Sequence, residues 1–160
     1  AGGTVSRVAD AITGAGDAGL FSSVNSSGCL IWKGAFLNEN VPAGAISLND
    51  GINTNRVQIY NTNTNVYVLL QVGGVTQFTA NTTTIDISET HTYVVRWDTN
   101  DFSLWVDGVE TLTDTSGDTF ASSTLNTLRF SDAGTSYIYA NSEYVMVTNY
   151  LTDTQIQNLP

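Results

Sequence analysis

The sequence predicts an all-β domain of the sandwich or barrel type, with one short helix at its carboxyl end. Short apolar runs recur along the chain with turn-forming residues between them, which is the pattern of such folds. Charged residues make up only 12%, about half the usual share, and Thr, Asn, Ser and Gly replace them. Thr favours strands and the other three favour turns, whereas long runs of helix-forming residues are absent.

Each predicted strand is a short apolar or alternating run, and Gly, Asn and Asp separate one run from the next. This turn chemistry is clearest at Asn49-Asp50-Gly51, Gly73-Gly74 and Asp107-Gly108. The predicted strands are Val5–Ala9, Cys29–Leu37, Ala45–Asn49, Arg56–Asn61, Val66–Val72, Thr76–Ala80, Thr92–Asp98, Phe102–Val106, Val109–Leu112, Thr127–Ser131, Tyr137–Tyr139 and Glu143–Thr148.

The stretch from Tyr93 to Leu112 predicts a three-strand meander. Apolar side chains alternate along the first two strands, and this alternation sets their register. Asp107-Gly108 is the two-residue signal of a type I′ hairpin. We expect Trp97 and Trp32 to lie in the core.

The tail 151–159 predicts the single helix. Thr152 is a good N-cap and Gln155 follows three residues later, which is the arrangement of a capping box. Leu151, Ile156 and Leu159 then fall near one side, so the helix should pack on the sandwich.

The length is that of one domain, residues 1–160, which we expect to be a fragment of a longer chain. A net charge of −10 disfavours nucleic acid, and it argues against anionic lipid or heavily sulfated glycan unless a cation bridges them. No apolar run is long enough to predict a membrane span. The single cysteine, Cys29, lies in an apolar run, so we expect a buried free thiol rather than a disulfide framework.

Two segments resemble a known family. His91–Asp98 followed by Phe102–Val109 resembles the hairpin typical of laminin-G-like and concanavalin A-like domains, and Tyr150–Leu159 resembles their final helix. The resemblance implies an antiparallel two-sheet β-sandwich, the concanavalin A-like jelly roll, which commonly binds carbohydrate or protein. Because this fold hosts many functions, the function must be argued from the site.

Further segments resemble one branch of that family, found in tail and other virion proteins of marine and gut bacteriophages. These segments are Arg7–Ala11, Ile46–Gly51, Asn55–Val57 and Asn100–Gly108. The resemblance implies a place on the virion surface or outside the cell, and bacterial surface proteins carry similar modules.

The sequence gives no support for an enzyme. Glycanases of the superfamily carry Glu-x-Asp-x-x-Glu on one strand face, and this motif is absent. Asp98 with Asp107 is the remaining acidic pair that the strands could bring together, although both resemble turn residues. His91 is the only histidine, which leaves no cluster for a catalytic metal.

Sugar recognition needs an aromatic face for stacking, with polar groups beside it. Trp105 alternates out of phase with the apolar residues of its strand, and Tyr67 alternates in the same way with Val66, Val68 and Leu70. Trp105 could face a ligand, or it could be covered by neighbouring structure or by a partner chain. The candidate binding residues are Trp105, Tyr67, Tyr60 and Arg96.

Calcium is the one cofactor that the resemblance suggests, bound by loop oxygens. Asp17, Asp50 and Asp132 are the candidate ligands. Calcium needs six to eight converging oxygens, and loop aspartates more often serve turn geometry.

The sequence therefore supports two hypotheses. The first is a non-catalytic adhesion module of a phage tail fibre or spike, or of a bacterial surface protein, that binds a glycan or host-surface polysaccharide. The second is a structural, assembly or decoration module that contacts other virion proteins or its own copies.

Overall fold

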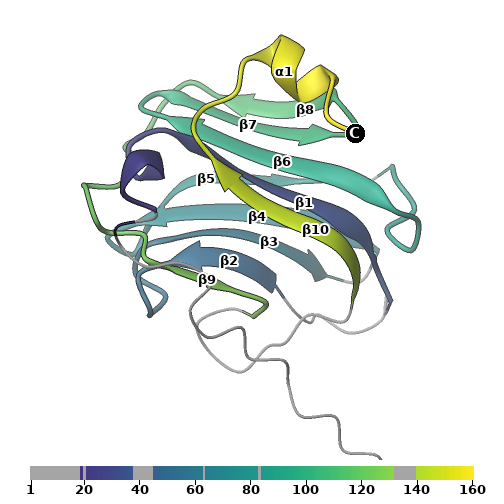
Figure 1. Cartoon of the computed structure of the whole chain (residues 1–160), viewed down its shortest axis with the longest axis horizontal. Coiled ribbons are helices and arrows are strands. Elements are labelled where there is room, and N and C mark those ends of the chain that lie inside the picture. Colours follow the sequence, from purple (N-terminus) through teal and green to yellow (C-terminus); the bar gives the residue numbers. More distant parts are fainter. Residues whose placement is uncertain (1–18, 20, 38–44, 63, 83, 132–139) are drawn as a thin grey trace, which may run out of the picture.

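The computed structural model describes residues 19, 21–37, 45–62, 64–82, 84–131 and 140–160. Among these residues, ten strands form two antiparallel sheets of five, accompanied by one 3-10 turn and one short α-helix (Figure 1). The predicted fold class, an all-β two-sheet sandwich of the concanavalin A-like jelly-roll type with one short C-terminal helix, is confirmed. No helix in this described part is long and apolar enough to cross a membrane.

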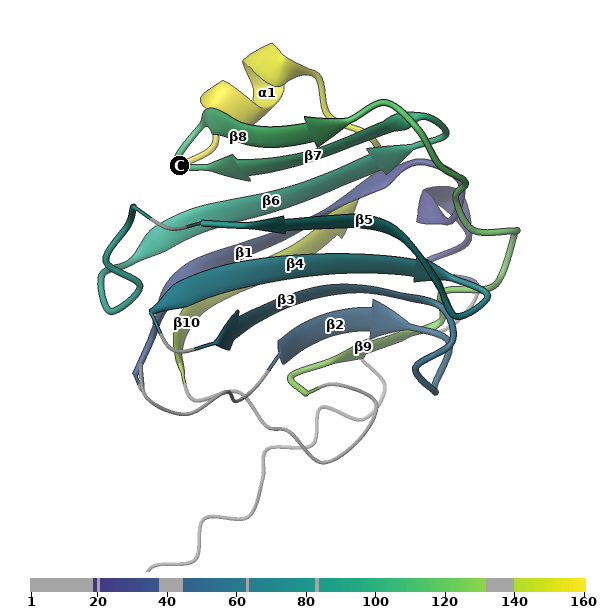
Figure 2. The ribbon, with the colours of Figure 1, turned by 180° about the vertical axis from the view of Figure 1, so that it is seen from behind.

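The two sheets, which we call sheet A and sheet B, face each other (Figures 1 and 2). Sheet A has the strand order β10-β1-β6-β7-β8 and sheet B the order β5-β4-β3-β2-β9. The strands of sheet A are β1 (Gly28–Phe36), β6 (His91–Asp98), β7 (Asp101–Val106), β8 (Val109–Asp114) and β10 (Ala140–Thr148). The strands of sheet B are β2 (Ala45–Asn49), β3 (Arg56–Thr62), β4 (Asn65–Val72), β5 (Val75–Asn81) and β9 (Thr127–Arg129).

The predicted strands that fall on described residues are all present. The largest difference is at β10, which begins at Ala140 rather than Glu143. The predicted strands Val5–Ala9 and Tyr137–Tyr139 lie outside the described residues.

The predicted meander is formed by β6, β7 and β8, which pair in that order. Asp107 and Gly108 join β7 to β8 with φ values of 50° and 75°. Positive φ at both central positions is the requirement of a type I′ turn, so the hairpin signal is confirmed.

The core between the sheets contains Trp32 and Trp97, as predicted, and both are fully buried. The Trp32 ring stacks on Tyr93 with centroids 5.3 Å apart. The Trp97 indole N–H donates to the carbonyl of Val24 at 3.0 Å, and Val24 ends the 3-10 turn η1 (Ser22–Val24). Without this bond the buried N–H group would have no partner, which would destabilise the fold.

Sheet A is also covered on its outer face. Cys29 and Ile31 alternate with the core residues of β1, and both are fully buried on the side away from sheet B. The helix α1 (Asp153–Gln157) covers them with Ile156. The capping box predicted at Thr152 and Gln155 is present, so the helix prediction is confirmed.

Gly34 provides a test of how tightly β1 is packed. A Cβ at this position would meet the carbonyl of Asn141 and would lie 2.6 Å from the Trp32 ring. We therefore expect Gly34→Ala to lower the free energy of unfolding by about 1–3 kcal/mol through overpacking. Urea unfolding followed by circular dichroism measures this change. Thr111→Ala on the exposed strand β8 is the control, with an expected change within about 0.5 kcal/mol.

Candidate functional site

Trp105 does not offer its ring to a ligand. Its side chain is only 3% exposed and belongs to an apolar cluster with Cys29, Ile31, Val94 and Ile156. The ring N–H donates to Ser103 Oγ at 2.9 Å. The hypothesis of a ligand-facing Trp105 is therefore wrong, because α1 covers this face; the alternative, coverage by neighbouring structure, describes the fold.

Arg96 holds this helix in place instead of facing a ligand. It is 5% exposed, and its Nη1 contacts Asp153 Oδ1 at 2.5 Å. Its guanidinium carbon lies 4.8 Å from the Tyr150 ring centroid and 5.5 Å from that of Trp105. Glu110 and Asp101 lie at 3.6 and 3.8 Å from Nη2. As a binding residue Arg96 was predicted wrongly, because its guanidinium is buried between two aromatic rings and is paired with Asp153.

Tyr60 and Tyr67 do come together on the outer face of sheet B. They are direct register partners on β3 and β4, and their rings stack with centroids 5.5 Å apart and an interplanar angle of 26°. Both are half-buried, whereas their strand neighbours Ile59 and Val68 are fully buried in the core. Because successive side chains of a strand point to opposite faces, burial of the apolar set presents the tyrosine pair outward.

Uncharged side chains, all but one of them able to form hydrogen bonds, surround the tyrosine pair. In Figure 2 the strands of sheet B are in front, and no described helix or strand crosses before them. The pairing of β3 with β4 and of β4 with β5 places further outward positions beside the two rings. The residues at these positions are Gln58, Leu69, Gln71, Thr79 and Asn81.

The outward side chains of β2, beside β3, are not accessible to a ligand. Ser47 and Asn49 occupy outward positions of β2 but are buried, and Asn49 Nδ2 donates to Ser47 Oγ at 2.8 Å. Ser47 Oγ in turn donates to the carbonyl of Ser131 at 2.7 Å. The accessible part therefore lies over β3, β4 and β5, and we call it the tyrosine face.

The two hydroxyl groups of the tyrosine face have different surroundings. Burial raises the pKa of Tyr60, as does the neighbouring Tyr67, while the guanidinium of Arg56 opposes this rise. Hydrogen bonds from the side chains of Thr62 and Asn65 lower the pKa of Tyr67. The Tyr67 hydroxyl thus lies among polar groups that a bound hydroxyl could share.

Asp50 serves a turn in the structure. Its carboxylate accepts hydrogen bonds from the backbone N–H groups of Ile52 and Asn55 and from Asn55 Nδ2. Asp17 and Asp132 lie outside the described residues. Within the described residues no group of three or more His, Cys, Asp and Glu side chains is placed to hold a metal ion. Calcium binding stays a prediction without support from this part of the chain.

The acidic pair Asp98 and Asp107 is separated by the length of β6. Asp98 ends β6, whereas Asp107 accepts from the backbone N–H of Thr92 at the start of that strand. Six residues of strand span about 20 Å, far beyond the carboxyl separation of about 5–9.5 Å that glycosidases use. This pair cannot act on one glycosidic bond.

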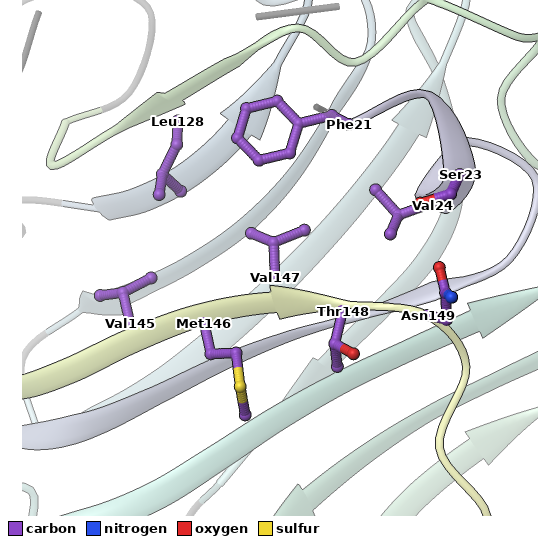
Figure 3. Close-up of a pocket in the computed structure, with 9 residues that line it drawn as sticks. All are labelled: Phe21, Ser23, Val24, Leu128, Val145, Met146, Val147, Thr148 and Asn149. Atoms are coloured by element: carbon purple, nitrogen blue, oxygen red, sulfur yellow. The ribbon is translucent and has the colours of Figure 1, made fainter. Parts of the chain in front are cut away.

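A pocket of about 500 Å³ opens between the edges of the two sheets, beside η1 (Figure 3). Val145 and Val147 of β10 point toward Leu128 and Phe21, while Met146 points away. Sequence reasoning did not find this pocket, because it depends on how the edge strands β9 and β10 diverge. Its lining includes the polar residues Ser23, Thr148 and Asn149 but no pair of stacked aromatic rings, so we take the tyrosine face as the better candidate.

No family model matches the sequence, and no curated protein matches it. The fold is similar to that of the carbohydrate-binding module CBM40 of Ruminococcus gnavus IT-sialidase. The structure of that module bound to α2,3-sialyllactose has a TM-score of 0.66 at 18% identity, covering 84% of this chain and 83% of the other. The structure bound to α2,6-sialyllactose has a TM-score of 0.62 at 16% identity, with the same coverage.

A second protein with a similar fold is the binding domain of botulinum neurotoxin DC, whose structure is in complex with SialylT. Its TM-score is 0.64 at 12% identity, and the match covers 86% of this chain and 36% of the other. At these identities the likeness shows the β-sandwich fold.

Cys29 provides a test of the cluster under α1. Burial raises the pKa of its thiol to about 11, although a backbone hydrogen bond at Leu151 and the charge of Arg96 act in the opposite direction. Below that pH the thiol stays protonated, so we expect no reaction with a thiol-specific reagent at about pH 8 in the folded protein and rapid reaction in denaturant. Rapid reaction of the folded protein would show that the helix does not cover Cys29.

Trp105 should matter for stability and not for ligand contact. We expect Trp105→Ala to lower the free energy of unfolding by about 3–5 kcal/mol, because it empties the cluster under α1. Denaturant unfolding measures the loss. The folded fraction of the variant should keep any glycan affinity of the parent protein. Loss of glycan affinity in folded protein would show that Trp105 contacts the ligand.

Proposed function

We propose that this chain is a non-catalytic glycan-binding module whose site is the tyrosine face of sheet B. The observation that carries the proposal is the stacked pair of Tyr60 and Tyr67 at the centre of a half-exposed sheet face. The apolar faces of sugar rings pack on aromatic rings, and their hydroxyls need polar partners at the rim. Thr79 and Asn81 occupy such rim positions, whereas Gln58 is buried beside the pair.

Structures of the same fold support a binding role. Both CBM40 structures hold a sialyllactose, and the botulinum neurotoxin DC domain is in complex with SialylT. These proteins are modules or domains that recognise glycans, and the tyrosine face supplies the corresponding chemistry in this chain. The separation of Asp98 from Asp107 supports a module without hydrolytic activity.

The proposed setting is the surface of a virion or another extracellular surface, in a phage tail fibre or spike or in a bacterial surface protein. The resemblance of several sequence segments to phage virion domains supports this setting. Fibres and spikes present several copies of a module, so weak sites can add to a useful avidity.

An assembly role through the Trp105 surface has less support. That role needs an accessible Trp105 for contact with a second copy or another virion protein, and α1 covers this residue. The glycan-binding role is therefore preferred over the structural one.

We expect Tyr67→Ala to weaken glycan binding about tenfold, equivalent to about 1.4 kcal/mol, because it removes one of the two stacking rings. Binding to a glycan array, followed by titration calorimetry on the best ligand, measures this loss. Tyr144→Ala is the matched control, because Tyr144 is also a half-buried strand tyrosine but lies on β10 of sheet A.

Equal losses in the two variants, or no retention of the parent protein across a broad array, would contradict the proposal. Release of reducing ends from a bound glycan would contradict its non-catalytic character.

A further inference from the structure

The outward side chains of sheet B form a small grid with Tyr67 at its centre. Tyr67 lies between its register partners, Tyr60 on β3 and Asn81 on β5, and its outward neighbours along β4 are Asn65 and Leu69. We call this set the central grid, and every member except Leu69 carries an amide or a hydroxyl group. The members are Gln58, Tyr60, Thr62, Asn65, Tyr67, Leu69, Thr79 and Asn81.

One end of the central grid is polar. Hydrogen bonds from the side chains of Thr62, Asn65 and Asn81 reach the Tyr67 hydroxyl and lower its pKa. A side-chain amide has two N–H donors and a carbonyl acceptor. An amide that is bonded to Tyr67 through one N–H therefore has a second N–H and a carbonyl with which it can bind a ligand hydroxyl. Asn65 and Asn81 are both half-buried, so a ligand can reach them.

The other end of the central grid is apolar. Leu69 follows Tyr67 on the outward face of β4 and is half-buried, and its register partner on β5 is the exposed Thr79. A sugar ring that packs on the tyrosine pair and Leu69 has hydroxyl partners at Thr79 as well as at the polar end. The central grid therefore combines an apolar surface with uncharged hydrogen-bonding groups, as recognition of a neutral sugar requires.

The charged groups around the central grid favour an uncharged ligand. Asp118 is exposed, and its backbone N–H donates to Gln77 Oε1 of β5 at 3.0 Å, so an acidic residue lies beside this edge of sheet B. Arg56 at the start of β3 already has an interaction and is not a free cation for a ligand. Arg129 Nη2 donates to a backbone carbonyl in the turn between β2 and β3 at 3.3 Å. The net charge of −10 adds a long-range repulsion of anions.

We propose that the tyrosine face selects neutral oligosaccharides over acidic ones, with a sugar ring on the tyrosine pair and its hydroxyls at Asn65 and Asn81. This inference rests on the proposed glycan-binding function and specifies its ligand class. The observation that carries it is the identity of the outward side chains, which are amides and hydroxyls around two stacked rings.

The selection follows from the hydrogen bonds that each kind of ligand can form. Sugar hydroxyls both donate and accept, as amide and hydroxyl side chains do, so the polar contacts with the central grid can be matched. A carboxylate only accepts, and water hydrates it strongly. Its transfer to this sheet face costs free energy unless a charge-assisted hydrogen bond replaces the lost hydration.

The test compares each of two acidic glycans with its own methyl ester, which has the same sugars without the charge. The acids are 3′-sialyllactose and trigalacturonate, and titration calorimetry measures their binding to the intact chain. We expect the ester to bind about tenfold more tightly than the acid in at least one pair, equivalent to about 1.4 kcal/mol. Added salt should strengthen binding of the acid, because it screens the repulsion, and should leave binding of the ester unchanged.

A lysine placed in the central grid should remove the selection. Thr79→Lys adds a cation beside the tyrosine pair, so we expect the acid to bind this variant at least as tightly as its ester. The matched control is Thr111→Lys, which adds the same charge at an exposed threonine on β8 of sheet A and should keep the selection. Circular dichroism checks that each variant is folded. If Thr79→Lys does not fold, the salt dependence of the parent protein decides.

The outcomes separate the two proposals. Acids that bind as tightly as their esters, or retention of the protein by acidic glycans alone on the array, would overturn the neutral selection and leave the glycan-binding function intact. Equal shifts in Thr79→Lys and Thr111→Lys would overturn the assignment to the central grid, because overall charge would then explain the selection. Failure of both pairs with retention by neutral glycans alone would support the selection. Failure of both pairs with no retention on the broad array would overturn both proposals.

Discussion

The candidate site depends on one constraint, the alternation of buried and outward side chains along β3 and β4. Ile59 and Val68 must lie in the core, and this burial fixes which side chains appear on the other face. A slip of one residue in either strand would bury a tyrosine and expose an apolar residue, so the register is strongly determined. The ring pair is therefore a consequence of core packing in this sheet and needs no separate element to hold it.

The two sheets use their outer faces differently because, within the described residues, only sheet A has a helix that covers it. On sheet A, the helix α1 and the guanidinium of Arg96 enclose Trp105, which makes that face part of a second apolar cluster. On sheet B, polar and aromatic side chains face outward over β3, β4 and β5, with no described helix above them. The carboxylates follow the same division, since those of the described strands all belong to sheet A.

Local patterns predicted most of the fold because strand alternation, the Asp107-Gly108 turn and the Thr152 capping box are all local signals. The site was predicted only in part. Tyr67 could be recognised by its phase, but the same argument applied equally to Trp105 and did not show that a helix more than forty positions later covers it. Arg96 was misassigned for the same reason, since its partner Asp153 is 57 residues away. Which outward face stays open is a tertiary property that strand periodicity alone does not encode.

The three tryptophans report on different parts of the molecule. Trp32 and Trp97 lie between the sheets, whereas Trp105 lies under α1 and beside Arg96. The turn at Gly108 lies so close to the backbone of Gln157 that an added Cβ would be only 3.2 Å from it, so the β7–β8 hairpin and the helix pack directly against each other. Intrinsic fluorescence should therefore have two sources, one in the core between the sheets and one in the cluster under α1. The emission of a protein that retains only Trp105 would report on the packing of α1 by itself.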